Sequence, residues 1–295
     1  MKVRIARQTI LTLTAVVAIG AWSAPAFAST VSIRGGDTLL VEGAKGGAGK
    51  GNAGKEANSF LITFEGVANR YVISDVADIS TADSACTDLG QTVSCAATGI
   101  TAISVKAGSG DDQVKVGATP ASSVTLEGED GNDSLSGGDD ATGETLNGGK
   151  GNDLMLGGNG PDQFIGAQGF DSVTYSDHTT AGVVATIGTG ADDGNAADGP
   201  PTARDNIDKT VEKVAGTSLA DLLIGSPNND VLVGLAGNDR LKGRTGADIF
   251  KGKGGIDILL AKDGQADKKL NCGPGKNSRE RAKIDQGLDP TPKSC

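Results

Sequence analysis

The middle of the chain repeats one pattern of apolar and polar positions every nine residues. The segments 148–156, 157–165 and 166–174 follow one another without a gap. Each has glycine at its first position, aspartate at its sixth and an apolar residue at its eighth. A repeat this short, with one inward apolar side chain per unit, predicts a solenoid in which every unit supplies a turn and a short strand.

A second array with the same period follows after a gap. Its five units begin at Gly216, Gly225, Gly234, Gly243 and Gly252. Their eighth positions, expected in the core, are Leu223, Leu232, Leu241, Phe250 and Leu259. Less regular copies upstream are a unit at 128–136, an eleven-residue unit at 137–147 with Leu146 inside, and a degenerate copy with Asp112 and Val114. The arrays together predict an all-β protein.

Two units match every fixed position of a known motif. Residues 148–156 and 157–165 both have the order Gly-Gly-x-Gly-x-Asp-x-apolar-x. An isolated Gly-Asn-Asp cluster is an ordinary turn, but contiguous copies at constant spacing are specific. The array resembles the haemolysin-type, or RTX, calcium-binding nonapeptide repeat. The resemblance implies a right-handed parallel β-roll, a β-solenoid in which six residues make a turn, three make a strand and two units complete one coil.

The residue types at the turns indicate a metal site by themselves. Glycines let the backbone adopt conformations closed to other residues and turn several carbonyl oxygens toward one point. Aspartate adds a charged oxygen, and six to eight oxygen ligands in a flexible arrangement favour Ca²⁺ over Mg²⁺. If two units complete a coil, aspartates 18 residues apart stack on the same edge. These pairs are Asp153 with Asp171, Asp221 with Asp239, Asp230 with Asp248, and Asp239 with Asp257.

The predicted ligands of several Ca²⁺ ions come from the turns of both arrays. The aspartates are Asp112, Asp133, Asp153, Asp162, Asp171, Asp221, Asp230, Asp239, Asp248 and Asp257. The glycines are Gly148, Gly149, Gly151, Gly157, Gly158, Gly160, Gly166, Gly169, Gly237, Gly246 and Gly255. Stacked carboxylates repel by roughly 1 kcal/mol per pair in water and about 3–4 kcal/mol at an effective dielectric near 20. We therefore expect the first array to fold only on binding calcium.

The second array departs from the motif at its second position. The residues there are Thr217, Ser226, Leu235, Arg244 and Lys253 instead of glycine. Its fourth position is also irregular, with leucine in the first unit and asparagine in the next. Basic side chains between residues 240 and 253 offer another way to neutralise the aspartates. Calcium binding and a metal-free solenoid therefore both remain open for this array.

The segments outside the arrays have weaker signals. Residues 29–106 predict a β segment with strands at 59–64 and 70–74 and a loop at 43–57. Residues 175–215 predict one strand at 183–187 followed by a loop. The loop aspartates Asp192, Asp193 and Asp198 miss the alternating spacing of an EF-hand, so we expect them to be solvated. His178, the one histidine of the chain, is expected to be a surface residue.

The N-terminus has the organisation of a secretory signal. Lys2, Arg4 and Arg7 precede an apolar stretch, and Ala26-Phe27-Ala28 forms a cleavage site before Ser29. We expect residues 1–28 to be removed and the mature protein to be secreted or held at the cell surface. An uncleaved anchor is disfavoured because the apolar run is shorter than the roughly 20 residues of a membrane span, and no other segment is apolar enough to cross a bilayer.

Cysteine usage agrees with export to an oxidising compartment. The four cysteines form two sequence-local pairs, Cys86 with Cys95 and Cys272 with Cys295, which we predict as disulfides. Three connectivities are formally possible, and local closure is favoured by loop entropy. The second bridge would hold the basic segment 261–295 as a cap on the open end of the solenoid.

The amino-acid composition excludes or disfavours several classes of function. A formal net charge of −10 disfavours nucleic-acid binding, and a single histidine excludes HExxH zinc proteases and three-histidine zinc sites. We expect a non-enzymatic calcium-binding module with a structural or adhesive role. Its partners beyond calcium would be an extracellular polysaccharide or a cell surface. The alternative is a carbohydrate-active solenoid that cleaves or binds polysaccharide through an acidic pair.

These patterns divide the chain into six segments. They are a signal peptide at 1–28, a β segment at 29–106, a first calcium-binding array at 107–174, an intervening strand and loop at 175–215, a second array at 216–260 and a C-terminal cap at 261–295. The cap is expected to abandon the nonapeptide pattern.

Overall fold

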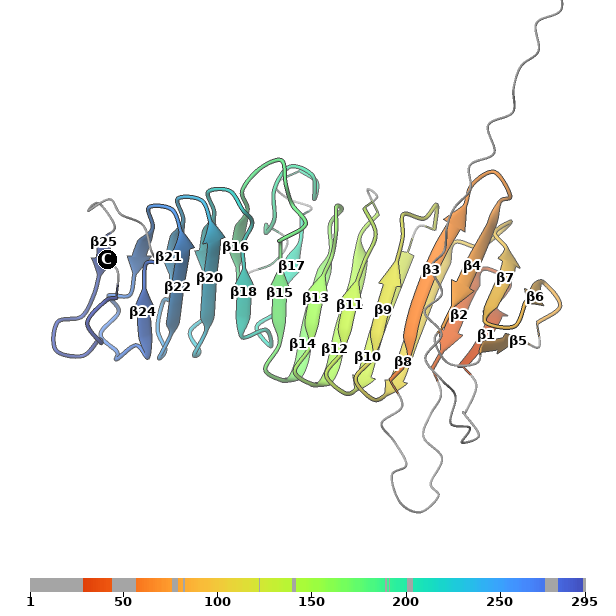
Figure 1. The fold of residues 1–295 in the computed structure, drawn as a ribbon, viewed down its shortest axis with the longest axis horizontal. Coiled ribbons are helices and arrows are strands. Elements are labelled where there is room, and N and C mark those ends of the chain that lie inside the picture. Colours follow the sequence, from red (N-terminus) through yellow and green to blue (C-terminus); the bar gives the residue numbers. More distant parts are fainter. Residues whose placement is uncertain are drawn as a thin grey trace, which may run out of the picture.

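The chain folds into an elongated stack of short strands (Figure 1). A computed structural model describes residues 29–43, 57–75, 79–81, 83–121, 123–139, 142–188, 190, 192–200, 204–273 and 281–293. Every regular element within these ranges is a β-strand. The prediction of an all-β solenoid is therefore confirmed.

An eight-stranded sheet forms one side of the first half of the stack. Its strand order is β17-β14-β12-β10-β8-β2-β1-β5. The strands are β1 (Ser29–Arg34), β2 (Thr38–Glu42), β5 (Ile79–Thr81), β8 (Ala102–Ser109), β10 (Ser123–Asp130), β12 (Glu144–Gly151), β14 (Gln163–Gly169) and β17 (Asn206–Ile207). From β2 to β17 all neighbours are parallel.

A twelve-stranded sheet faces it and runs along the whole stack. Its order is β24-β22-β20-β18-β15-β13-β11-β9-β3-β4-β7-β6. The strands are β3 (Ser59–Glu65), β4 (Arg70–Ser74), β6 (Cys86–Asp88), β7 (Thr92–Ala96), β9 (Gln113–Val116), β11 (Ser134–Ser136), β13 (Leu154–Leu156), β15 (Ser172–Thr174), β18 (Lys213–Ala215), β20 (Val231–Ala236), β22 (Ile249–Gly254) and β24 (Lys269–Asn271).

A five-stranded parallel sheet replaces the eight-stranded sheet in the second half. Its order is β16-β19-β21-β23-β25. The strands are β16 (Val184–Thr186), β19 (Leu222–Ile224), β21 (Arg240–Lys242), β23 (Ile258–Leu260) and β25 (Arg281–Lys283). β16 corresponds to the strand predicted between the two arrays.

The core consists of apolar side chains that stack in one row on the inner face of each of the facing sheets. In the twelve-stranded sheet, parallel pairing stacks Leu135 on Met155 and Met155 on Val173. In the five-stranded sheet it stacks Leu223 on Leu241 in the same way. All of these side chains are fully buried. The apolar eighth positions of the repeats therefore form the core, as predicted.

The N-terminal segment shares both sheets with the repeats. β1 and β2 form an antiparallel pair, as do β3 and β4, and β2 and β3 then pair in parallel with β8 and β9. The predicted disulfide between Cys86 and Cys95 joins the antiparallel strands β6 and β7. This part of the chain extends the roll at one end (Figure 1).

Some predictions fall on residues outside the described ranges. They include the signal segment 1–28, most of the loop at 43–57, and Cys295. Cys272 is completely buried beyond β24, and its pairing with Cys295 stays a prediction. Within the described ranges, no helix has the length and apolar character needed to span a membrane.

Candidate metal centre

The turns between strands are stacked so closely that glycine is required in them. Gly151 and Gly169 have φ values of +127° and +142°, which side-chain-bearing residues rarely adopt. A Cβ on Gly151 would overlap the carbonyl oxygen of Gly131 in the neighbouring coil, and a Cβ on Gly169 would overlap that of Gly151. The fourth-position glycines therefore let carbonyl groups of successive turns approach one another.

The first-position glycines make room for the aspartate of the same unit. A Cβ on Gly148 would overlap the carboxylate of Asp153, and a Cβ on Gly157 would overlap that of Asp162. The aspartate side chain thus folds back onto the start of its own turn. Its oxygen lies against backbone because only hydrogen occupies that side of the glycine.

The aspartates form ladders along the edges of the stack. The backbone N–H of each ladder residue donates to the Oδ1 atom of its counterpart in the next coil. The N···Oδ1 distances are 2.8 Å for Asp112 to Asp133, 2.7 Å for Asp133 to Asp153, 2.9 Å for Asp153 to Asp171, 3.0 Å for Asp221 to Asp239, 2.8 Å for Asp230 to Asp248 and 2.9 Å for Asp239 to Asp257. The four stacked pairs predicted from the 18-residue spacing are confirmed.

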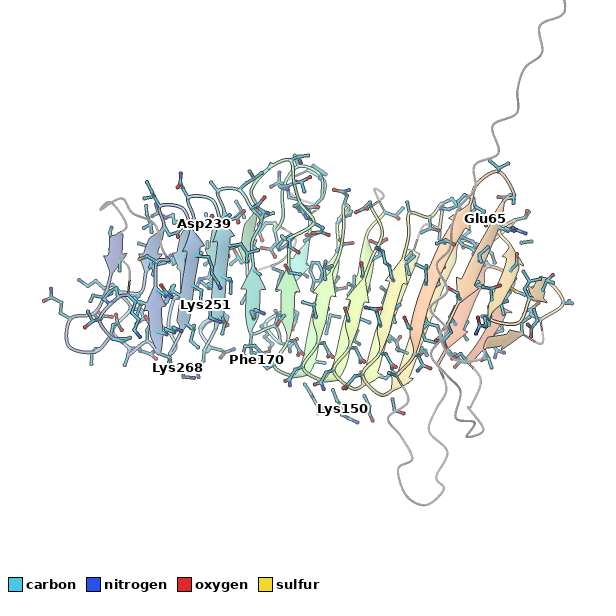
Figure 2. All side chains as sticks on the ribbon, in the orientation of Figure 1. Glu65, Lys150, Phe170, Asp239, Lys251 and Lys268 are labelled. Atoms are coloured by element: carbon cyan, nitrogen blue, oxygen red, sulfur yellow. A yellow bond between two sulfur atoms is a disulfide. The ribbon has the colours of Figure 1, made fainter. Side chains whose placement is uncertain are left out.

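The ladders lie on opposite edges of the roll. Asp239 is at one long edge, whereas Lys150, in the turn that contains Asp153, is at the other (Figure 2). A shorter ladder on the eight-stranded sheet joins Glu144 to Asp162, whose Oδ1 accepts the Glu144 N–H at 2.8 Å. Every nonapeptide aspartate predicted as a ligand is buried.

The ladders of the first array continue into the segment 175–215. The N–H of Asp162 donates to Asp205 Oδ1 at 2.8 Å, and the N–H of Asp171 donates to Glu212 Oε2 at 2.8 Å. Asp205 and Glu212 are therefore ladder residues that sequence analysis missed. Asp205 lies 43 residues from Asp162, and Glu212 lies 41 residues from Asp171. Neither separation is a multiple of nine, so the period of the repeat did not predict these two residues.

One ladder also continues into the C-terminal segment. The N–H of Asp248 donates to Asp267 Oδ1 at 2.8 Å, and that of Asp267 donates to Asp289 Oδ1 at 3.0 Å. This segment has lost the nonapeptide sequence, but its residues Asp267 and Asp289 keep the carboxylate positions of the ladder. The coil geometry therefore extends further than the sequence repeat.

The second oxygen of most repeat aspartates has no hydrogen-bond donor among the described residues. These buried Oδ2 atoms belong to Asp112, Asp133, Asp153, Asp162, Asp171, Asp239, Asp248 and Asp257. Leaving such an atom unsatisfied costs about 1–3 kcal/mol, and more when it is charged. A repeated set of buried, negatively charged and unsatisfied oxygens calls for a cation.

Burial raises the pKa of these carboxyl groups. It raises the pKa of Asp133, Asp171 and Asp248 to about 7 and that of Asp239 to about 8. Neighbouring carboxylates of the same ladder raise these pKa values further, while the backbone N–H donors oppose the shift. Without a cation, the folded state therefore disfavours the ionised form of these carboxyl groups.

Acidification is expected to stabilise the metal-free chain. A carboxyl group whose pKa is raised in the fold contributes stability that is present below its unfolded pKa of 3.8 and is lost as the pH rises through about 6 to 8. In calcium-depleted buffer, thermal unfolding should occur at a higher temperature at pH 5 than at pH 8. With saturating calcium the order should reverse, because protons compete for the carboxylates. A metal-free melting temperature that is higher at pH 8 would contradict this assignment.

The donor set fits a hard cation such as Ca²⁺. No three Asp, Glu, His or Cys side chains converge on one point in the described part of the chain. A bound ion would therefore take its remaining ligands from the stacked backbone carbonyls that the glycines expose. Carboxylate and carbonyl oxygens are the ligands that Ca²⁺ prefers.

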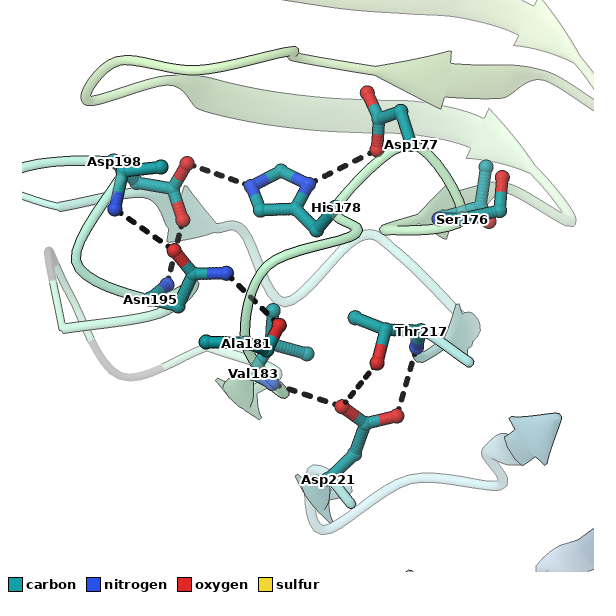
Figure 3. Close-up of polar contacts among 11 residues, drawn as sticks. Ser176, Asp177, His178, Ala181, Val183, Asn195, Asp198, Thr217 and Asp221 are labelled. Carbon is teal, nitrogen blue, oxygen red and sulfur yellow. Dashed lines mark hydrogen bonds and ion pairs between the residues drawn. The ribbon is translucent and has the colours of Figure 1, made fainter. Parts of the chain in front are cut away.

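His178 is buried, contrary to the expectation of a surface residue. Only 7% of it is exposed, and both ring nitrogens are engaged (Figure 3). Nε2 lies 2.7 Å from Asp198 Oδ1, and Nδ1 lies 3.0 Å from Asp177 Oδ1. Burial lowers the pKa of His178, but these two carboxylates outweigh it and bring the pKa to about 10. The imidazole is therefore charged at neutral pH.

The loop that contains Asp198 is also packed, which corrects the prediction of solvated side chains for Asp193 and Asp198, whereas Asp192 is exposed as predicted. Asp193 and Asp198 are completely buried. Asp193 accepts hydrogen bonds from the N–H groups of Thr186 and Ile207, and Asp198 accepts one from Asn195 N–H at 2.6 Å. These carboxylates hold the intervening segment 175–215 against the roll. Isolated carboxylates in a Gly- and Pro-rich segment gave no periodic signal from which this could be predicted.

Removal of the His178 charge should destabilise the fold strongly. His178→Gln leaves the buried Asp198 carboxylate without its cationic partner, which typically costs about 3–5 kcal/mol. Asp177→Asn is the matched control, because Asp177 is exposed and such a contact contributes at most about 1 kcal/mol. Denaturant unfolding at pH 7 measures both changes. Equal losses in the two variants would contradict the buried ion pair.

The facing parallel sheets and the stacked aspartates along their edges define a β-roll with ladders of buried carboxylates. A family model for the RTX calcium-binding nonapeptide repeat matches residues 125–141, 140–173 and 224–259. The matched segments are RTX calcium-binding nonapeptide repeats of the haemolysin type, as the sequence resemblance predicted. A sequence search of curated proteins gave no match.

Proposed function

We propose that the chain binds several Ca²⁺ ions at its glycine–aspartate turns and that these ions hold the β-roll together. The observation that carries this proposal is the set of eight buried repeat-aspartate Oδ2 atoms, between Asp112 and Asp257, that have no hydrogen-bond donor in the described part of the chain. The turns that present them also bring backbone carbonyls of adjacent coils into close approach. The family of the repeats supports calcium as the cation.

We propose further that the calcium-loaded roll serves as a structural or adhesive module and not as an enzyme. The carboxylates that dominate its edges are buried and engaged in coil-to-coil hydrogen bonds. His178 is held between Asp177 and Asp198, so neither ring nitrogen is available as a general base. Extended solenoids offer long surfaces to a polymer or a cell surface.

The proposed site of action is outside the cell. The pattern of residues 1–28 supports it, as does the Cys86–Cys95 disulfide, because disulfides persist in oxidising compartments. Expression of the whole chain in a bacterial host, followed by mass measurement of the exported product, tests this. The expected product begins at Ser29. Retention of residues 1–28 would contradict the signal assignment.

Calorimetric titration with CaCl₂ tests the binding function. We expect several ions per chain, with Kd on the order of 10⁻⁴–10⁻³ M if the sites resemble other extracellular modules. MgCl₂ should give little heat. Asp153→Asn with Asp171→Asn should lower the stoichiometry, whereas Asp88→Asn, which changes an exposed carboxylate in β6, should not.

A panel of polysaccharides separates the structural role from the carbohydrate-active alternative. The module should release no reducing sugar from any of them, with or without calcium. Cleavage that is lost on changing an acidic pair away from the repeat turns, while calcium binding is retained, would overturn the non-enzymatic proposal.

A further inference from the structure

The second position of the repeat unit divides the turns into two kinds. In eight units this residue has a left-handed backbone, with φ between +71° and +107°. These residues are Gly108, Glu129, Gly149, Gly158, Ala167, Leu235, Arg244 and Lys253. Glycine is thus not required for this conformation, even though it costs other residues about 1–2 kcal/mol. Thr217 and Ser226, at the same position of the two units that begin the second array, do not adopt it.

The two kinds of turn differ at the aspartate as well. The eight units with a left-handed second residue contain the eight nonapeptide aspartates whose buried Oδ2 atom has no donor among the described residues. All eight also have glycine with positive φ at the fourth position. The units of Thr217 and Ser226 have Leu219 and Asn228 there instead. Backbone conformation and carboxylate environment therefore change together.

In the unit of Thr217, the protein itself satisfies the carboxylate. Asp221 Oδ2 accepts the Thr217 N–H at 2.7 Å (Figure 3). Asp221 Oδ1 accepts the Thr217 hydroxyl at 2.9 Å and the N–H of Val183 at 2.8 Å. The hydroxyl oxygen in turn accepts the N–H of Leu219 at 2.9 Å, which closes the turn. Such hydroxyl-closed turns are stable without a ligand.

The unit of Ser226 repeats this arrangement. Asp230 Oδ2 accepts the Ser226 N–H at 2.6 Å and the Ser226 hydroxyl at 3.1 Å. The hydroxyl oxygen accepts the N–H of Asn228 at 3.0 Å. Both Thr217 and Ser226 are buried, with at most 1% of their surface exposed. Their hydroxyls therefore contact the carboxylates without competition from water.

We infer that the turns of Thr217 and Ser226 are closed by their own hydroxyl groups and bind no cation, whereas the eight left-handed turns are the calcium sites. This inference rests on the calcium-binding function proposed above and assigns it to particular turns. The two hydroxyl-closed turns begin the second array directly after the segment 175–215. One lies on each of the two ladders of that array. They give that array a first coil whose shape is independent of calcium.

Linkage to calcium concentration tests the inference on the intact chain. The slope of unfolding free energy against the logarithm of free calcium reports the number of ions lost on unfolding. Thr217→Val combined with Ser226→Ala should lower stability equally at all calcium concentrations and leave this slope unchanged. The matched pair, Asp239→Asn with Asp248→Asn, lies on the same two ladders and should lower the slope by about two ions.

A gain-of-site variant covers the case in which the hydroxyl variants do not fold. Thr217→Gly with Leu219→Gly restores the glycine pattern of the other turns, and we expect it to bind one additional ion. Equal loss of slope in the hydroxyl pair and the aspartate pair would overturn the inference, as would an unchanged stoichiometry in the folded glycine variant. A slope of zero in the unaltered chain would instead contradict the proposed calcium binding itself.

Discussion

Withdrawal of calcium at pH 7.5 is expected to unfold the repeats. At this pH most of the ladder carboxylates lose the stability that protonation would give them, since the raised pKa values of Asp112, Asp133 and Asp248 are about 6 to 7. Adjacent charges at the ~4.8 Å spacing of strands repel by roughly 3–4 kcal/mol per pair at an effective dielectric near 20. The backbone N–H donors of the ladders offset only part of this repulsion, because the pKa values of these carboxyl groups remain raised.

The linked binding energy is large enough to decide the folded state. One site at a hundredfold excess of calcium over Kd contributes ~2.7 kcal/mol, and a typical domain is stable by only about 5–15 kcal/mol. Two or three sites therefore suffice, and eight turns are available. Circular dichroism and size-exclusion chromatography should show loss of β-signal and an expanded chain in excess chelator. Both should recover with Ca²⁺ and not with equimolar Mg²⁺. An unchanged β-signal in chelator would contradict the account.

Gly169→Ala is expected to be among the most damaging single substitutions in the first array. The new Cβ would overlap the carbonyl oxygen of Gly151 in the adjacent coil, and φ of +142° is also unfavourable for alanine. Neither turn can move away, because both are fixed by parallel pairing of β12 and β14. Overpacking of this kind costs about 1–3 kcal/mol or more, in addition to about 1–2 kcal/mol for the left-handed backbone.

Gly264→Ala separates these two contributions. Gly264 also has a positive φ, of +88°, but a Cβ there would meet nothing within 4 Å. It should cost only the backbone part, roughly 1–2 kcal/mol, and leave calcium stoichiometry intact. Thermal unfolding in saturating calcium measures both variants. If Gly169→Ala is no worse than Gly264→Ala, the close stacking of the turns is wrong.

The regular part of the fold could be predicted because one period governs its sequence. Met155, Phe164 and Val173 recur at the same position of consecutive units, so their burial and the stacking of Asp153 on Asp171 follow from arithmetic. The motif also supplied the chemistry of the turns, since oxygen ligands and glycines recur with the same spacing. Local repetition therefore allows the fold of such a solenoid to be predicted from its sequence.

The remaining parts depend on contacts between residues far apart in sequence. Asp205 and Glu212 continue the ladders across an insertion whose length bears no relation to nine. The buried His178 contacts Asp198, 20 residues away in the sequence. The second positions of the second array do not share one backbone conformation. Thr217 departs from the motif and changes the turn, whereas Leu235 departs from it and keeps the left-handed backbone.

An anomalous difference map from crystals grown in excess CaCl₂ would locate the bound cations themselves. We predict calcium peaks beside the Oδ2 atoms of the eight unsatisfied carboxylates, Asp153 and Asp239 among them, and none beside Asp221 or Asp230. Turns that stay without a peak at Asp153, Asp162 and Asp171 while the chain remains fully folded would contradict the view that cations hold this roll together.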